Sequence, residues 1–259
     1  MRIGFLGAGN MASAILRGMR DMEKGCYDIS EAAVRRAEQE LGARGFSSGE
    51  ALCAWADIVV LAVKPQVLEG AVRPLAGALA GKAVASIAAG WSLERLTALL
   101  PESRLCRVMP NTPAMVGAGM AAIAKETTFA PAEFDCISEV FSAIGRVVVV
   151  EERLFDAVTA VSGSGPAYLY MVIEAMADAG VREGLSRASA LELAAQTALG
   201  SAKMVLESGM HPAALRDMVC SPGGTTIDAV CTLEEKGLRA AVESAVRVCA
   251  EKSRAMSKQ

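Results

Sequence analysis

IGFLGAGNMA, residues 3–12, is the stretch of sequence that decides the fold of this chain. An apolar run, expected to be a strand, ends at Gly7, and an Ala-rich stretch of helical composition follows Gly9. Gly7 permits a tight turn, Gly9 lets the backbone approach a pyrophosphate, and Ala12 allows a helix to pack closely on a strand. The stretch therefore predicts a Rossmann-type α/β domain that binds a dinucleotide through the amides at the helix start. The alternative is a structural turn in another α/β fold.

Outward from this motif, residues 2–150 alternate between short β-rich runs and Ala-rich stretches. This rhythm predicts βαβ units on a doubly wound parallel sheet. We expect strands at residues 2–6, 26–28, 57–63, 82–87, 104–109, 120–124 and 146–150. We expect helices at residues 11–23, 31–41, 48–55, 66–79 and 132–144.

The β pattern disappears after Val150, and the rest of the chain has helical composition. We therefore expect a dinucleotide-binding Rossmann domain over residues 1–150 and an all-α substrate and dimerisation domain over residues 151–259. Residues 167–181, AYLYMVIEAMADAGV, are apolar almost all round, and a helix of that kind must be buried. A small helical domain has little interior to enclose such a helix, so we expect burial between two chains and at least a homodimer.

Composition argues against several other classes of function. The net charge is -3 and the 26 Lys and Arg residues are scattered, which predicts neither nucleic acid nor a membrane surface as a partner. The apolar runs are far shorter than the roughly 20 residues of a membrane-spanning helix, and the amino terminus lacks a secretory pattern, so we expect a cytoplasmic protein. Seven cysteines without a C-x-x-C pair, and one histidine, favour reduced thiols over a disulfide framework or a metal site.

Asp28 stands at the end of the second expected strand. An acid at this place usually accepts hydrogen bonds from the adenosine ribose and repels a 2′-phosphate, which favours NADH. Arg35 and Arg36 are close in sequence and offer cations for NADPH. A third interpretation is that Asp28 caps the helix that begins near Ser30.

Four further segments place small or hydroxylated residues in loops beside expected strand or helix ends, where open α/β sheets bind ligands. They are AVKP (62–65), VMPNTP (108–113), SGSGPAY (162–168) and SPGGTT (221–226). Taken singly, each is equally typical of an ordinary turn.

Taken together, the motifs GAGNMA, LAVKP, IAAG (87–90), VMPNTP, SGSGPAY and SPGGTT occur in the order found in pyrroline-5-carboxylate reductases, and the chain resembles that family over its whole length. The resemblance implies an oxidoreductase of proline biosynthesis. It would reduce L-1-pyrroline-5-carboxylate to L-proline by hydride transfer from NADPH or NADH to the imine, without a metal. It also implies a homo-oligomer, either a dimer or a ring of dimers.

The resemblance further implies roles for individual residues. We expect the substrate carboxylate at the amides and hydroxyls of Gly223, Gly224, Thr225 and Thr226, where a loop enters a helix. Thr226 and Ser164 are the catalytic candidates, while Pro166 and Asn111 are expected to contact the substrate. The expected cofactor-binding residues are Leu6, Gly7, Ala8, Gly9, Asn10, Met11, Asp28, Ala62, Val63, Lys64, Pro65, Ala88, Ala89 and Thr112.

Two alternatives remain at this point. A β-hydroxyacid dehydrogenase would carry an asparagine or aspartate four residues after a helical lysine, whereas Lys203 is followed there by Glu207. A non-catalytic NAD-sensing protein could use the same fold. Among single residues, His211 as a general acid and Cys220 as a reactive thiol are weaker hypotheses than a helix start and a core position, respectively.

Overall fold

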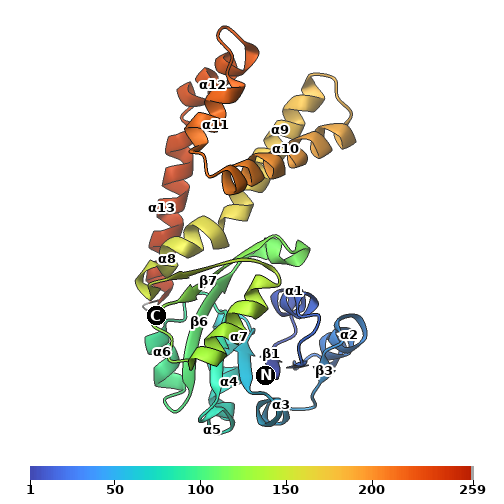
Figure 1. Ribbon diagram of the computed structural model, residues 1–259, viewed down its shortest axis with the longest axis vertical. Coiled ribbons are helices and arrows are strands. Elements are labelled where there is room, and N and C mark those ends of the chain that lie inside the picture. The colour runs from blue at the N-terminus through green and yellow to red at the C-terminus, as the bar shows by residue number, and fades with distance from the viewer. Residues whose placement is uncertain (258–259) are drawn as a thin grey trace. The chain divides into compact units, whose positions relative to one another are not determined.

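An eight-stranded sheet in the order β3-β2-β1-β4-β5-β6-β7-β8 forms the amino-terminal part of the computed structural model, which describes residues 1–257 (Figure 1). Its strands are β1 Ile3–Leu6, β2 Lys24–Tyr27, β3 Arg44–Gly45, β4 Ile58–Leu61, β5 Ala83–Ser86, β6 Arg104–Pro110, β7 Gly119–Ala124 and β8 Gly145–Val150. Strands β1 to β6 are parallel to their neighbours, β7 is antiparallel to β6, and β8 is parallel to β7. The order of the first six strands is that of a doubly wound nucleotide-binding sheet, so the predicted fold class is confirmed.

Helices cover both faces of this sheet. Their bounds are α1 Asn10–Gly18, α2 Glu31–Leu41, α3 Gly49–Trp55, α4 Leu68–Val72, α5 Ala76–Leu79, α6 Leu93–Leu99 and α7 Pro131–Ser142. In β4, Ile58 and Val60 pack into the core on the side of α1, α2 and α7, while Val59 and Leu61 pack into the core on the side of α3 to α6. Alternate residues of one strand thus enter two separate cores, which explains why β4 is apolar without alternation.

Several elements differ from those expected. The helix expected at 11–23 ends at Gly18, and a short loop follows before β2 begins at Lys24. Lys24 Nζ stabilises this helix end by donating to the carbonyls of Leu16 and Met19. The helix expected at 66–79 is broken into 3₁₀ turns and the short helices α4 and α5, with Pro74 in the interruption, since proline cannot donate the helical hydrogen bond. Strand β3 and helix α6 had not been predicted.

Two compact units make up the chain. The sheet unit comprises Met1–Ser164 together with residues 249–257, and the helical unit comprises Gly165–Val248. Between β8 and the end of the sheet unit lie a 3₁₀ turn at Glu152–Leu154, helix α8 at Phe155–Val158 and a π-helical turn at Thr159–Gly163. The domain boundary was expected after Val150, where the β pattern of the sequence ends. The compact units of the structure divide 14 residues later, after Ser164.

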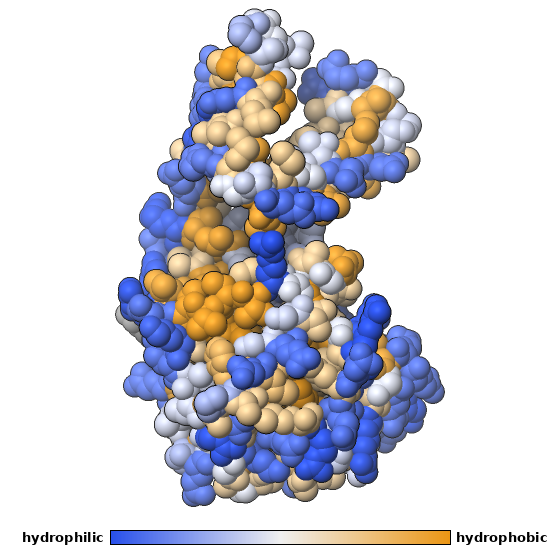
Figure 2. Space-filling view, viewed as in Figure 1, coloured by the Kyte–Doolittle hydropathy of each residue, from blue (hydrophilic) through white to orange (hydrophobic). Residues whose placement is uncertain are grey.

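The helical unit contains α9 Gly165–Arg182, α10 Arg187–Ser208, α11 Pro212–Val219, α12 Thr225–Glu235 and the greater part of α13 Leu238–Ser257. Its small internal core consists of Ala177 on α9 with Ala190 and Ala194 on α10. Most of the apolar side chains of α9 are exposed in the single chain, and apolar residues lie at the surface of these helices (Figure 2). Within residues 1–257, no helix has the length and apolar character needed to cross a membrane.

Candidate active site

The glycine-rich turn after β1 fits a bound pyrophosphate. Gly7 has φ of 102°, and a side chain there would begin 2.7 Å from the carbonyl oxygen of Ala62, so only glycine suits the position. Gly9 is the N-cap of α1, is exposed, and has no atom within 4 Å of the place where a Cβ would stand. No side chain caps this helix end. The first-turn amides, including those of Asn10 and Met11, are therefore available to phosphate oxygens.

The loops expected to surround a cofactor leave the sheet at the same edge as this turn. Strands β1, β4, β5 and β6 are parallel, so their carboxyl ends lie together. The amide of Ala62 donates to Leu6 O (2.8 Å) and that of Ile87 donates to Leu61 O (3.2 Å), which extends the strand pairing into the loops. The segments AVKP and IAAG thus begin beside the glycine-rich turn, at the edge where doubly wound sheets bind nucleotides.

Asp28 follows β2 and points at the glycine-rich turn. Its Oδ2 accepts from the amide of Ala8 (2.7 Å) and its Oδ1 accepts from the amide of Ser30 (2.9 Å). Ser30 itself caps α2 by accepting from Ala33 N (3.4 Å), so the hypothesis that Asp28 caps this helix is wrong. Of the two arginines, Arg36 reaches the turn and donates to Ala8 O (3.4 Å).

Trp91 links two of these loops by a hydrogen bond, although it lies outside every motif recognised in the sequence. It is 6% exposed, and its indole N–H donates to Pro65 O (3.0 Å), which joins the loop after β5 to the loop after β4. The guanidinium of Arg95 lies 4.2 Å from the Trp91 ring centre. Within the expected cofactor loops, Lys64 is exposed, Val63 and Ala89 are half-buried, and Ala88 is buried.

Asn111 directly follows β6, and both ends of its amide are engaged. Its Nδ2 donates to Ser162 O (3.2 Å) and Ser162 Oγ (3.3 Å), and its Oδ1 accepts from Met120 N (2.8 Å). Asn111 therefore fixes the start of the SGSG segment. Thr112, the next residue, is exposed and begins a 3₁₀ turn.

Ser164 is the C-cap of the π-helical turn, a local distortion that often occurs at functional sites. Its amide donates to Thr159 O (2.8 Å), and its hydroxyl accepts from the Cys249 thiol (3.2 Å). Because Ser164 Oγ is the acceptor in that contact, its own proton can be donated to another group.

In the helical unit, the SPGGTT loop leads into α12. Gly223 has φ of 65°, and the amide of Gly224 donates to Ser221 O (3.0 Å), which makes a tight turn. Gly224 is the N-cap of α12, and no side chain caps this helix. The first-turn amides, with those of Thr225 and Thr226, form an arrangement that favours an anion. Pro166, another candidate, lies in the first turn of α9.

The histidine and the buried cysteines serve the fold: His211 caps a helix, and three cysteines lie in the core. His211 caps α11, with its Nδ1 accepting from Ala213 N (3.2 Å). Burial raises the pKa of the thiols of Cys26, Cys53 and Cys106 to about 11, so these thiols are poor nucleophiles. Cys220 is half-buried. Over residues 1–257, no group of three or more His, Cys, Asp or Glu side chains is placed to hold a metal ion.

Comparison with known proteins identifies the family. Residues 152–256 match the family described as "Pyrroline-5-carboxylate reductase dimerisation", and residues 2–90 match "NADP oxidoreductase coenzyme F420-dependent". The pyrroline-5-carboxylate reductase of Methanosarcina acetivorans is 45% identical over 266 residues, covering 100% of this chain and 98% of the relative. The chain belongs to the pyrroline-5-carboxylate reductase family.

Solved structures of family members share the whole fold. A pyrroline-5-carboxylate reductase from Coxiella burnetii superimposes with a TM-score of 0.93 at 31% identity, covering 100% of this chain and 99% of that chain. The Plasmodium falciparum pyrroline carboxylate reductase with NADP bound gives a TM-score of 0.89 at 32% identity, covering 99% and 98%. The resemblance based on the six sequence motifs is thus confirmed, and the chain carries the dimerisation domain of pyrroline-5-carboxylate reductases.

Proposed function

We propose that this member of the pyrroline-5-carboxylate reductase family reduces L-1-pyrroline-5-carboxylate to L-proline with NADH or NADPH. The observation that carries the proposal is the occurrence, in one chain, of an uncapped phosphate cradle after β1 and of the complete dimerisation domain of this family. The reduced nicotinamide supplies the hydride, so the protein has to hold, orient and shield the two reactants.

The cofactor is held by the edge of the sheet unit. The turn from Leu6 through Ala8 to Met11 takes the pyrophosphate on backbone amides. The loops Ala62–Pro65 and Ala88–Ala89 follow the neighbouring strands and contact the nicotinamide end of the cofactor. Thr112 contacts the same end.

The SPGGTT loop binds the substrate carboxylate. Supporting this proposal, the uncapped start of α12 offers amides and two threonine hydroxyls to an anion. A charge-assisted hydrogen bond to a backbone amide is stronger than a neutral one, so this contact orients the ring before hydride transfer. Pro166 and Asn111 are the further candidates for contact with the substrate.

Two hydroxyls are the candidates for handling the imine proton. Thr226 is the group we place near the imine nitrogen, and Ser164 is the second catalytic candidate because its proton can be donated while its oxygen holds the Cys249 thiol. Reduction of the imine consumes one hydride and one proton, and either hydroxyl can relay that proton from water.

The direct test is the loss of NADH and NADPH absorbance with and without pyrroline-5-carboxylate. Decay that depends on the substrate is expected with at least one cofactor. A folded protein that binds both cofactors but gives no such decay would disprove the proposed reaction.

Thr226→Ala tests the proposed hydroxyl. We expect kcat/KM for the imine to fall about 100-fold while NADH affinity is unchanged, the lower end of the range typical of a lost proton-transfer group. Thr226→Ser, which keeps the hydroxyl, is the matched control and should retain most of the activity. Equal kcat/KM in the parent and the alanine variant would remove Thr226 from the site.

We also propose that Asp28 gives the enzyme a preference for NADH. The carboxylate is held on the glycine-rich turn by Ala8 N, where it would accept from ribose hydroxyls and repel a 2′-phosphate. Arg36 donates to the carbonyl of Ala8, the residue whose amide Asp28 holds. Its guanidinium is therefore the cation that would bind the 2′-phosphate when the Asp28 carboxylate is removed. Asp28→Ser should therefore lower the NADPH dissociation constant and raise that of NADH in calorimetric titrations.

The helical unit is proposed to form a homodimer in a cytoplasmic enzyme. The exposed apolar side chains of α9 and α10 support this proposal because apolar surfaces of this kind mark protein interfaces. Sedimentation velocity on the full chain tests it, and a monomer at micromolar concentration would contradict it.

A further inference from the structure

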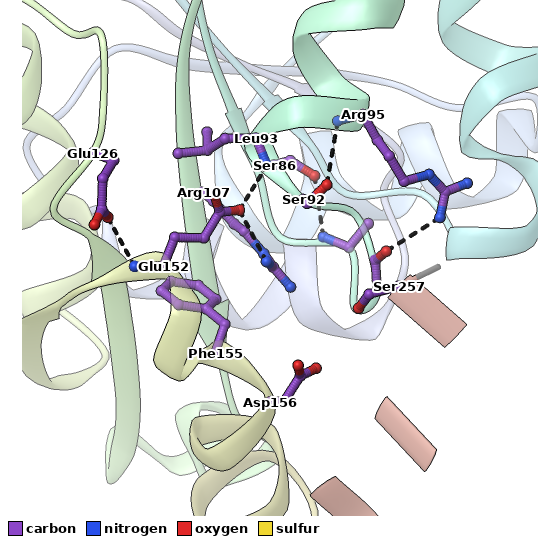
Figure 3. A network of polar contacts seen from close by, with 12 residues as sticks. Ser86, Ser92, Leu93, Arg95, Arg107, Glu126, Glu152, Phe155, Asp156 and Ser257 are labelled. Atoms are coloured by element: carbon purple, nitrogen blue, oxygen red, sulfur yellow. Dashed lines mark hydrogen bonds and ion pairs between the residues drawn. The ribbon is translucent and has the colours of Figure 1, made fainter. Parts of the chain in front are cut away.

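Glu152 makes an unusual contact with the start of α6. Its Oε1 accepts from the backbone amide of Leu93 at 2.6 Å, although the two residues are 59 positions apart in the sequence (Figure 3). Leu93 is the first residue of α6, so Glu152 satisfies one of the amides that a helix start leaves unpaired. The loop that carries IAAG ends at this anchor.

A buried cation holds Glu152 in place. Arg107 on β6 is 5% exposed, and its guanidinium donates to the same Glu152 oxygen at 3.0 Å. The guanidinium also lies 4.5 Å from the ring centre of Phe155 on α8 (Figure 3). A second acid, Glu126, accepts from the Glu152 amide at 2.8 Å and fixes its backbone. Arg107 is buried and Glu152 is partly exposed, so removing Glu152 alone would leave a buried guanidinium without its ion pair, which is costly.

The other parts of the IAAG loop are also fixed. Ser86, next to Arg107 in the sheet register, accepts from Ala88 N at 3.3 Å. Trp91 donates from its indole to Pro65 O at 3.0 Å. The loop is therefore tied to the sheet at its start, to the AVKP loop at Trp91 and to Glu152 at its end.

Glu152 also begins the segment that leads to the catalytic candidate Ser164. The 3₁₀ turn, α8 and the π-helical turn run without interruption from Glu152 to Gly163. Asn111, at the end of β6, holds Ser162 at the other end of this run. One side chain, Glu152, thus connects the loop beside the proposed nicotinamide position to the element that ends at Ser164.

From these contacts we infer that Glu152, held by Arg107, is a positioning residue that sets the distance between the nicotinamide-side loop and the Ser164 segment through its bond to the Leu93 amide. The inference rests on the proposed function, because it concerns the geometry of the same reaction. Small misplacements of reacting groups have large effects on rate, so this bond should act mainly on kcat.

The test compares two double variants that differ only in whether the side chain at position 152 can accept from Leu93. Arg107→Met with Glu152→Gln, the acceptor variant, removes both charges but keeps a carbonyl oxygen for the amide. Arg107→Met with Glu152→Met, the acceptor-free variant, removes the charges and the acceptor. Both variants lose the same two charges and leave Asp156 without the nearby guanidinium to the same extent, so they differ in the acceptor alone.

We expect the acceptor-free variant to have a kcat about 10- to 100-fold below that of the acceptor variant, with KM for the imine within about threefold, at equal unfolding midpoints. Hydrogen exchange of the Leu93 amide, measured without cofactor, should be faster in the acceptor-free variant than in the acceptor variant. A purely structural role would change the unfolding midpoint and leave the ratio of kcat values near one.

Equal kcat values in the two double variants would overturn the inference, provided the parent enzyme is active. A parent that reduces no imine with either cofactor would instead disprove the proposed function, which keeps the two failures distinct. Should the double variants not fold, exchange in the parent decides. A Leu93 amide that exchanges as fast as that of the exposed Glu94 shows that the anchor is absent in solution and overturns the inference.

Discussion

Strand β4 and helix α9 are both strongly apolar in sequence, yet they differ in burial. All four residues of β4 are 0% exposed, whereas Leu169, Tyr170 and Met171 of α9 are 57%, 60% and 69% exposed in the single chain. Each face of β4 packs on helices of its own chain, whereas the buried cluster of the helical unit holds a single residue of α9, Ala177, against α10. Apolar sequence therefore forms a core in the sheet unit and an exposed apolar face in the helical unit.

The largest effect should come from opening a cavity in the sheet unit. Phe141 of α7 is 0% exposed, and Phe141→Ala should lower the free energy of unfolding by about 3–5 kcal/mol. Urea unfolding followed by circular dichroism measures this loss, with Phe141→Leu as a milder control. A loss below about 1 kcal/mol would mean that the sheet unit does not depend on its own core in the way the comparison requires.

The opposite change tests the helical unit. Leu169→Glu places a charge on the exposed apolar face of α9, which should raise the dimer dissociation constant at least about tenfold while the single chain stays folded. Sedimentation equilibrium gives the constant. Ala54→Glu, on the exposed side of α3, adds the same charge to the sheet unit and should leave the dimer intact. Equal dissociation constants for these two variants would exclude this face as the interface.

A smaller effect concerns a pair of charges in the sheet unit. Hydrogen bonds from Arg104 hold the pKa of Glu133 below its usual value, and Glu133 also accepts from Ala130 N (2.8 Å). Since the folded pKa is lowered, this stabilisation is complete above the unfolded pKa of about 4.3 and is lost as the pH falls through the folded pKa. Glu133→Gln should cost about 1–2 kcal/mol at pH 7 and less near pH 3. Unfolding midpoints at the two pH values check this, and a cost that does not depend on pH would contradict it.

The sequence predicted the elements whose causes are local. The turn at Gly7 and Gly9 was predicted because the chemistry of each glycine is read from a few neighbouring residues. Strand β3 was missed because two residues, Arg44 and Gly45, carry no periodicity. Helix α6 was missed although Ser92 caps it by accepting from Arg95 N (3.2 Å).

Hydrogen bonds between residues far apart in the sequence produce no local sequence pattern, so they could not be predicted. The bonds from Leu93 to Glu152, from Trp91 to Pro65 and from Asn111 to Ser162 each join loops that meet only after the sheet has formed. The sequence alone leaves the role of Asp28 open for a related reason. An aspartate suits a helix N-cap and a contact with the glycine-rich turn equally well, so the residue type does not distinguish the two roles. The geometry of Ser30 as the cap distinguishes them.

The position of Trp91 gives the protein a built-in optical probe. The chain has two tryptophans, and Trp55 packs against Phe46, which directly follows the edge strand β3, with ring centres 5.2 Å apart. Trp91 instead lies at the two loops of the carboxyl edge, bonded to Pro65 O. Because indole emission overlaps the absorption of a reduced nicotinamide, a dihydronicotinamide bound at that edge would quench Trp91 and gain fluorescence itself, so that arrival and departure of the coenzyme become visible without any label.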